Sequence, residues 1–230
     1  MRKLSRRHKE NLEKTKNKIY SNLAEAVQTI KETATAKFVE SVELHANLNI
    51  DPKYADQQLR TTVTLPHGIG KQVKIAVLTN EENFEEARQA GADIIGNEEL
   101  IENITKGIIN FDLLIATPNM MPKLAKLGRV LGPKGLMPSP KSGTVSNALT
   151  ATLTDFKKGK FEYKADKTGV VHVTIGKVNF TENQLLDNLQ ALYNSIEKNR
   201  PAGVKGKYFK SVFLSTTMGP SLKLDLTSFG

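Results

Sequence analysis

The sequence predicts an α/β protein of two domains: a two-layer α/β sandwich built discontinuously from both ends of the chain, and a three-layer α/β domain inserted between them. The first observation is charge, because residues 68–156 hold 9 Lys and Arg against 10 Asp and Glu, out of totals of 33 and 24. The second is apolar periodicity, which has period two in the flanks and forms unbroken runs in the middle. The two flanks share a basic charge and a period-two apolar pattern, and the segment between them has neither. This indicates a discontinuous domain at residues 1–67 and 157–230, interrupted by a second domain at residues 68–156.

The amino-acid composition excludes several classes of function. The chain has 230 residues, 39% of them hydrophobic, which suits two folded domains better than a disordered chain. It has no cysteine, which excludes a disulfide framework, a thiolate metal site and a cysteine nucleophile. No apolar run approaches the ~18–20 residues of a membrane span. The net charge of +9 comes from the flanks and favours a polyphosphate partner.

The first flank predicts a helix followed by two strands. Apolar residues recur at helical spacing at Ile19, Leu23, Val27 and Ile30. Residues 2–18 are mostly charged, and we expect them to fray or to extend as a basic arm. From Phe38 the period changes to two, which predicts a half-buried strand whose inward residues are Val42, Leu44, Ala46 and Leu48. A second strand follows at residues 59–65.

The middle segment predicts strands and helices in alternation. We expect strands at residues 73–78, 93–95 and 113–116, with helices at 84–91 and 98–105. Thr117-Pro118 is typical of a helix start, a Gly- and Pro-rich loop follows at 128–143, and a last helix begins near Ser146. Apolar strands without alternation indicate a small parallel sheet covered on both faces.

The second flank returns to half-buried strands. Phe161 and Tyr163 face one way, and in the next strand Val171, Val173 and Ile175 do the same. Thr181 and Gln184 have the spacing of a capping box and open a helix with an apolar stripe at Leu185, Leu189, Leu192 and Ile196. Residues 207–215 and 222–226 are the closing strands. Glycines at the two crossings between the domains predict a hinge at Gly68, Gly70 and Gly159.

Enzyme chemistry finds no support in the motifs. A dinucleotide site needs glycines after the first strand of the insert, where this chain has Thr79-Asn80-Glu81-Glu82, and the two carboxylates would repel phosphate. The two glycine-rich loops, at residues 68–71 and 128–135, both lack the residue spacing of a P-loop. The four histidines lie far apart in sequence, with no carboxylate at ligand spacing: His8, His45, His67 and His172. We therefore expect no catalytic residue, no metal site and no cofactor.

A nucleic-acid interface has more support. Basic and small polar residues lie on or beside the strands of the flanks, on the faces opposite the apolar ones: Lys37, Ser41, Glu43, Lys164, Lys167, His172, Thr174, Lys207 and Ser211. Such groups suit phosphate and ribose contacts, although each alone is as well explained as a solvated surface residue. Loop 215–220 adds three hydroxyls, Met218 and a glycine. Strict alternation would place Phe38 on the core side, and the few aromatic residues favour recognition of shape and backbone over base stacking.

Four motifs carry a resemblance to a known family. They are Lys37-Phe38-Val39-Glu40-Ser41-Val42-Glu43, then Leu131-Gly132-Pro133-Lys134-Gly135-Leu136-Met137-Pro138, then Gly169-Val170-Val171-His172 with Ile175-Gly176-Lys177, and Ser215-Thr216-Thr217-Met218-Gly219. In this order they resemble the ribosomal protein L1 family, over almost the whole chain. The resemblance implies an inserted domain that is Rossmann-like and a terminal domain that binds large-subunit ribosomal RNA at the mobile stalk.

The resemblance also implies partners and contact residues. The stalk helps to release deacylated tRNA from the exit site, and many members bind their own messenger RNA and repress its translation. The protein is expected to be a monomer when free of the ribosome, without a membrane partner. The RNA contacts it implies are Lys37, Phe38, Ser41, Glu43, Lys164, Lys167, Thr168, Gly169, His172, Ser211, Thr217, Met218 and Gly219.

The place of the protein in the cell remains open between two alternatives. Residues 31–38 and 51–60 resemble cyanobacterial and plastid members, and the abundance of Asn, Lys and Ile suggests an AT-rich genome. The first expectation is the chloroplast stroma, bound to the ribosome, and the alternative is a bacterial cytoplasm. Two rival functions also stay open at this point: a nucleotide-dependent enzyme using the middle domain, and a general nucleic-acid chaperone that binds by charge alone.

Overall fold

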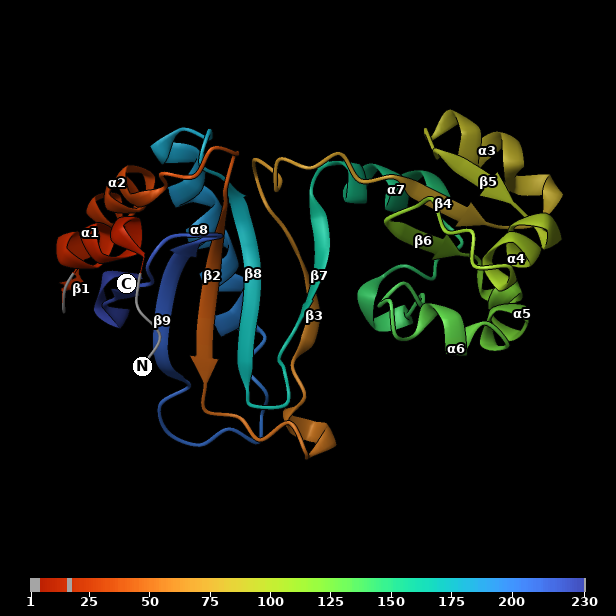
Figure 1. The fold of residues 1–230 in the computed structure, drawn as a ribbon. Coiled ribbons are helices and arrows are strands. Elements are labelled where there is room, and N and C mark those ends of the chain that lie inside the picture. The colour runs from red at the N-terminus through yellow and green to blue at the C-terminus, as the bar shows by residue number, and fades with distance from the viewer. Residues whose placement is uncertain (1–4, 16–17, 230) are drawn as a thin grey trace. The chain divides into compact units, whose positions relative to one another are not determined.

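A computed structural model describes residues 5–15 and 18–229 of the chain (Figure 1). The chain divides into two compact units: Met1–Gly70 with Glu162–Gly230, and Lys71–Phe161 between them. We call these the terminal unit and the inserted unit. The sequence placed the corresponding boundaries at residues 67/68 and 156/157.

A five-stranded sheet organises the terminal unit. Its strands lie in the order β1 (Ile19–Tyr20), β10 (Leu222–Leu224), β9 (Phe209–Thr216), β2 (Ser41–Leu48) and β8 (Val170–Lys177). The short β1 is parallel to β10, and the other pairs are antiparallel. Strand β2 therefore pairs along its length with two strands that lie more than 120 residues away in the chain. A separate two-stranded sheet joins β3 (Arg60–Thr64) to β7 (Lys160–Lys164).

Helices cover one face of this sheet. They are α2 (Leu23–Thr33) and α8 (Glu182–Lys198), and α8 lies behind the sheet in the view of Figure 1. Helix α1 (Arg6–Thr15) is joined to the end of α2, because the Asn11 side-chain amide donates to the Thr33 carbonyl at 2.8 Å. The predicted capping box is confirmed, because the Gln184 N–H donates to Thr181 Oγ1 and the Thr181 N–H donates to Gln184 Oε1. The predicted stripe of α8 is fully buried. Alternation in β2 is also confirmed, since its inward residues are at most 1% exposed.

The other side of the sheet we call the open face. It carries the outward residues of the three longest strands, paired across the sheet: Ser41, Glu43, His45 and Asn47 of β2, His172 and Thr174 of β8, and Ser211, Phe213 and Ser215 of β9. These residues are mostly half-buried by their strand neighbours rather than covered by helices. The two-layer architecture predicted for the flanks is confirmed.

Two expectations for the first flank are wrong. Ile19 does not lie on the helix stripe; it is 56% exposed in β1, and the helix begins at Leu23 after the cap of Asn22, whose side chain accepts the Ala24 N–H. The reason is tertiary, because Tyr20 pairs with β10 from the far end of the chain and is buried. The predicted basic arm is a helix at residues 6–15, and residues 2–4 and 16–17 lie outside the described residues.

The inserted unit is built on a three-stranded parallel sheet. Its order is β5 (Ile94–Gly96), β4 (Ile75–Leu78) and β6 (Leu113–Ala116). Alternate residues of β4 enter two separate cores: Ala76 and Leu78 pack with Ile104 and Leu124 on one face, and Ile75 and Val77 pack beneath another group on the other. The helices are α3 (Phe84–Gln89), α4 (Glu98–Thr105), α5 (Met121–Ala125), α6 (Gly128–Leu131) and α7 (Leu149–Lys157). The predicted three-layer α/β insert is confirmed.

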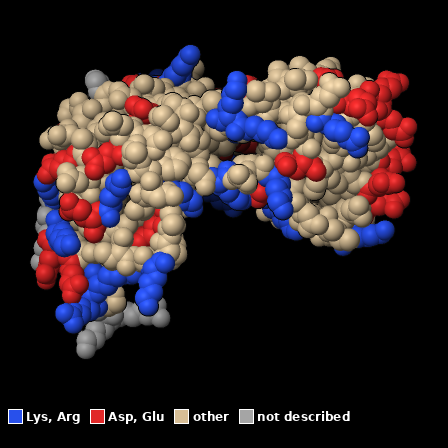
Figure 2. Space-filling view, turned by 90° about the horizontal axis from the view of Figure 1, so that it is seen from above, with Lys and Arg blue, Asp and Glu red and all other residues tan. Residues whose placement is uncertain are grey.

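Charge is unevenly spread over the inserted unit. Residues 79–112 hold 9 acidic and 2 basic residues, whereas residues 113–154 hold 5 basic residues and no acidic one. On the right-hand side of Figure 2, acidic side chains crowd one edge of this unit. The net charge of −1 over residues 68–156 therefore conceals two regions of opposite sign.

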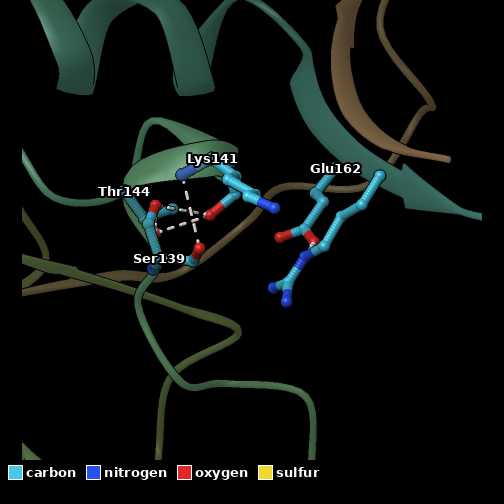
Figure 3. Close-up of polar contacts among 6 residues, drawn as sticks. Ser139, Lys141, Thr144 and Glu162 are labelled. Carbon is cyan, nitrogen blue, oxygen red and sulfur yellow. Dashed lines mark hydrogen bonds and ion pairs between the residues drawn. The ribbon is translucent and has the colours of Figure 1, made fainter. Parts of the chain in front are cut away.

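The loop expected at residues 128–143 contains regular structure. It includes α6 and a hydrogen-bonded turn in which Thr144 Oγ1 accepts the Ser139 N–H at 2.9 Å and Ser139 Oγ accepts the Lys141 N–H at 3.3 Å (Figure 3). The last helix of the unit begins at Leu149 rather than near Ser146. Short 3₁₀ turns complete the chain at Ala55–Gln57, Glu81–Asn83, Pro118–Met120, Pro140–Ser142 and Leu226–Phe229. Among the described residues, no helix has the length and apolar character needed to cross a membrane.

Candidate nucleic-acid interface

The residues expected to contact RNA separate into two groups at opposite ends of the open face. One group, the loop cluster, comprises Lys37, Phe38, Ser41, Thr217, Met218 and Gly219. The other, the turn cluster, comprises Lys164, Lys167, Thr168, Gly169 and Ser211. Glu43 and His172 lie between them on the open face. Seven residue steps along β2 at ~3.3 Å each separate the two ends by about 23 Å.

Backbone and side-chain hydrogen bonds hold the loop cluster together. The Ser41 N–H donates to Thr217 Oγ1 at 3.0 Å, and the Thr217 N–H donates to the Ser41 carbonyl at 3.1 Å. Lys177 Nζ donates to Ser41 Oγ at 2.8 Å. Residues 176 positions apart in sequence therefore form one polar surface, to which Lys177 adds a cation that sequence reasoning quoted in a motif but did not assign.

A buried carboxylate anchors the same cluster from beneath. Glu40 is 2% exposed, and its two carboxylate oxygens accept separate backbone N–H groups: that of Ala36 at 3.1 Å and that of Met218 at 2.9 Å. Its own carbonyl accepts the Val178 N–H at 3.0 Å. Glu40 thus ties together the segments before β2, after β9 and after β8. Sequence reasoning quoted Glu40 in a motif but assigned it no role, because no local pattern shows that a carboxylate at the start of a strand is buried.

The apolar members of the loop cluster face solvent. Phe38 is 55% exposed and Met218 is 50% exposed, which corrects the expectation that alternation places Phe38 on the core side. Alternation fails here because β2 begins only at Ser41, so Phe38 belongs to a loop. Residues 36–40 of this loop, with Ala34, Val178 and Asn179, line a hollow of about 360 Å³. Exposed apolar groups of this kind are typical of a contact surface.

A second carboxylate shapes the turn cluster. Asp166 Oδ1 accepts the N–H groups of Thr168 and Val170, both at 2.8 Å, and the Thr168 hydroxyl at 2.7 Å. These bonds, with that of the Val170 N–H largest, lower the pKa of Asp166 below its ordinary value. The turn displays Lys167 and Thr168, which are exposed.

Gly169 has a structural reason to be glycine. It is buried with φ of +82°, and a Cβ there would lie 3.1 Å from the Ile50 carbonyl oxygen. A side chain at this turn would be strained in the left-handed region and crowded against the neighbouring backbone. Its neighbours Lys167 and Thr168 present side chains at the surface, whereas Gly169 itself presents none.

Two histidines meet at the centre of the open face. His45 Nδ1 lies 2.8 Å from His172 Nδ1, and His45 Nε2 lies 2.8 Å from Ser215 Oγ. Burial, with electrostatic repulsion from the neighbouring His172 next, lowers the pKa of His45 below 6.5, against the opposing effect of Glu43. The sequence separates these histidines by 127 positions, and only the pairing of β2 with β8 brings them together.

The geometry suits recognition and offers little for catalysis. The open face presents ammonium, hydroxyl and imidazole groups along three strands, with an exposed apolar group at one end. Polar side chains on a preformed sheet suit phosphate and ribose contacts. In the inserted unit, β4 leads through Thr79 into a turn that bears Glu81 and Glu82, as the sequence indicated. Across residues 5–15 and 18–229, the His, Asp and Glu side chains form no group of three suited to a metal ion.

Comparison with known proteins gives consistent matches. A family model described as "Ribosomal protein L1p/L10e family" matches residues 30–220. The chain is 78% identical over 229 residues to "Large ribosomal subunit protein uL1c" of Phaeodactylum tricornutum, and 76% identical over 229 residues to the protein of the same name from Trieres chinensis, with 100% of each chain covered. It is 58% identical over 228 residues to "Large ribosomal subunit protein uL1" of Rippkaea orientalis, covering 99% of this chain and 95% of the relative.

Proposed function

Because the chain belongs to the ribosomal protein L1p/L10e family, we propose that it is a structural component of the large ribosomal subunit that binds large-subunit ribosomal RNA through its terminal unit. Membership of a family of ribosomal proteins makes it a ribosomal component rather than an enzyme. The terminal unit is the proposed RNA-binding domain, and the bound element is the stalk RNA that the resemblance implies.

The loop cluster is the observation that carries this proposal. Segments from both flanks converge there through the Ser41–Thr217 and Glu40–Met218 hydrogen bonds. A surface ordered before binding loses little conformational entropy when RNA arrives, which favours affinity. In our mechanism Lys37 and Lys177 neutralise phosphates, Phe38 and Met218 pack against sugar or base, and the backbone near Gly219 approaches ribose. The turn cluster then contacts a second stretch of the same RNA with Lys164 and Lys167.

Thr217→Val tests the loop cluster in the full chain. Valine keeps the shape but cannot accept the Ser41 N–H, so we expect affinity for a stalk-type ribosomal RNA fragment to fall by about 1–3 kcal/mol. Thr64→Val is the matched control, because Thr64 is exposed on β3 outside both clusters. Lys14→Ala should change only the salt dependence, and that slightly. Unchanged affinity for Thr217→Val, with the melting curve intact, would remove the loop cluster from the interface.

Selectivity for the stalk-type RNA over a plain RNA duplex distinguishes the proposed function from binding by charge alone. Each titration is run across a salt series with the stalk-type fragment and with a plain RNA duplex. Stalk-selective binding that persists at high salt supports the proposal. Equal binding to both RNAs that collapses with salt would support a general nucleic-acid chaperone instead.

We further propose the two family roles that involve other RNAs. The protein helps to release deacylated tRNA from the exit site, and it represses translation of its own messenger RNA by binding a similar RNA fold. The support is membership of the family. Repression is tested by cell-free translation of the natural messenger leader with added protein; synthesis that is unaffected at saturating protein would contradict it.

The proposed location is the plastid ribosome. Support comes from the two algal relatives at 76–78% identity, whose names carry the designation uL1c, against 58% for the cyanobacterial relative. The bacterial cytoplasm is the alternative. Antibody detection in ribosomes purified from isolated plastids tests the assignment, and recovery only in non-plastid ribosomes would contradict it.

A further inference from the structure

We infer that the inserted unit carries a second RNA-binding surface, a basic ridge formed by Lys123, Lys126, Arg129 and Lys134, which contacts the phosphate backbone of double-helical RNA. The ridge goes beyond the proposed function, which assigns RNA recognition to the terminal unit alone. It also gives a role to the second motif of the resemblance, residues 131–138, none of whose residues was assigned a contact.

Charge distribution is the first observation. No acidic residue occurs between Asp112 and Asp155, and the basic residues of that stretch include the whole ridge. Apart from Asp155, the acidic residues of the unit belong to the preceding stretch, which includes α3 and α4. A unit with a net charge near zero thus presents one strongly basic segment, which concentrates a positive field where an anionic partner can use it.

The burial pattern of residues 121–131 places the basic side chains at the surface. In residues 121–131 the buried positions are Leu124, Leu127 and Leu131, which enter the core against β4 and β6. The basic positions Lys123, Lys126 and Arg129 recur every three residues and are exposed. Lys123 lies in α5, Arg129 lies in α6, and Lys126 lies in the turn between these two helices. The segment therefore buries its leucines in the core and leaves its basic side chains at the surface.

A rigid loop extends the ridge beyond α6. The Leu136 N–H donates to the Leu131 carbonyl at 3.1 Å, and the Gly135 N–H donates to the Gly132 carbonyl at 3.0 Å. Gly135 has φ of +71°, a backbone conformation that favours glycine. The loop presents Lys134 between two exposed glycines and beside Pro133, so the backbone there can be approached closely. Leu136 and Met137 anchor it by packing on the core.

Most of the positive charge of the ridge is not neutralised by nearby carboxylates. Lys123 pairs with Glu98 at 2.7 Å, but elsewhere in the described part of the chain no carboxylate lies within ion-pair distance of Lys126, Arg129 or Lys134. Three such cations within nine residues repel one another and gain when a polyanion binds. The ridge has no aromatic side chain on which a base could stack. Phosphate backbone is therefore the chemistry it fits, and A-form RNA supplies it in the surroundings of a ribosomal protein.

The test removes three ridge charges in the full chain. Lys126→Gln, Arg129→Gln and Lys134→Gln are combined, leaving the Lys123–Glu98 pair in place. The control combines Arg88→Gln, Lys106→Gln and Lys158→Gln, which removes the same charge from exposed positions of the same unit outside the ridge. Each protein is first saturated with the stalk-type ribosomal RNA fragment, and binding of a labelled second RNA is then titrated across a salt series. The second RNA is a deacylated tRNA in one arm and a plain duplex of similar length in the other.

The salt slope gives the decisive readout. Each lost phosphate contact reduces the magnitude of the slope of log affinity against log salt concentration by about 0.9. The slope should therefore be smaller by about two to three in the ridge variant and almost unchanged in the control. Equal losses in both arms support a surface for A-form backbone in general, and a loss confined to tRNA identifies tRNA as its ligand. If the ridge variant behaves as the control does, or if the wild-type complex binds no second RNA, the inference is overturned. Failure of the proposed function would appear earlier, as no binding of the stalk-type fragment.

Discussion

Individual residues of the loop cluster are constrained by packing as much as by chemistry. Gly219 is an example, because its φ does not require glycine but a Cβ there would collide with Thr216 Oγ1. That hydroxyl is buried, and no partner for it lies among the described residues. The absence of a side chain at position 219 therefore lets the strand end and the loop approach closely, and it keeps Met218 at the surface.

Gly219→Ala should disorder the loop cluster and weaken RNA binding. Because the clash involves one oxygen, the double variant Gly219→Ala with Thr216→Ala should restore most of the affinity, since alanine at 216 removes that oxygen. Affinity for the stalk-type fragment, measured by fluorescence titration beside melting temperatures, checks both variants. A double variant as weak as the single one would mean that the Cβ of residue 219 obstructs the RNA itself.

At the scale of elements, Glu40 couples three segments that no local pattern connects. Glu40→Gln keeps the size of the side chain but replaces one acceptor oxygen by an NH₂ group, which then faces a backbone N–H. We expect RNA affinity to fall by about 1–3 kcal/mol. The salt slope should stay unchanged, because Glu40 touches no phosphate. Glu197→Gln on the exposed face of α8 is the control, and a change in slope for Glu40→Gln would argue against a positioning role.

The pairing of β2 with β8 makes stability depend on pH through His45. Burial holds the pKa of folded His45 below the 6.5 of the unfolded chain, so the unfolded state binds more protons as the pH falls. Stability from the neutral imidazole is present above pH 6.5 and is lost as the pH falls through the folded pKa. The free energy of unfolding, from urea titrations at pH 7.5 to 5, should therefore fall more steeply in the wild type than in His45→Gln. Parallel curves would show that the pair contributes nothing.

At the scale of the whole molecule, the hinge remains a prediction. Gly68, Gly70 and Gly159 have φ of +62°, +71° and +102°, so each adopts a conformation that other residues resist. Gly68 is the best site for a test, because a Cβ there meets nothing within 4 Å and would add only backbone strain. The control is Gly206→Ala in the terminal unit, at φ of +75° and also in open space.

Small-angle scattering of the full chain distinguishes the two variants. If Gly68 absorbs rotation between the units, Gly68→Ala should change the distribution of interatomic distances while Gly206→Ala leaves it as in the wild type. Identical distributions for all three proteins would contradict a hinge at Gly68.

Sequence pattern was sufficient wherever neighbours in the chain decide the structure. The apolar stripe and capping box of α8, the alternation of β2 and the parallel strands of the insert all follow from local periodicity and were predicted correctly. Local pattern failed where a distant segment intervenes. Ile19 belongs to β1 because β10 pairs with it, and Phe38 is exposed because β2 begins at Ser41.

The candidate interface shows the same division. The fold class, the family and the residue types that can meet RNA follow from composition, spacing and motifs, so the sequence alone was enough to predict them. Which of these residues lie side by side became clear from the three-dimensional fold. It separated the loop cluster from the turn cluster, joined His45 to His172, and revealed Glu40 as a buried anchor. The physical reason is that hydrogen bonds and burial depend on distances in space, and antiparallel pairing brings together residues that stand more than 100 positions apart.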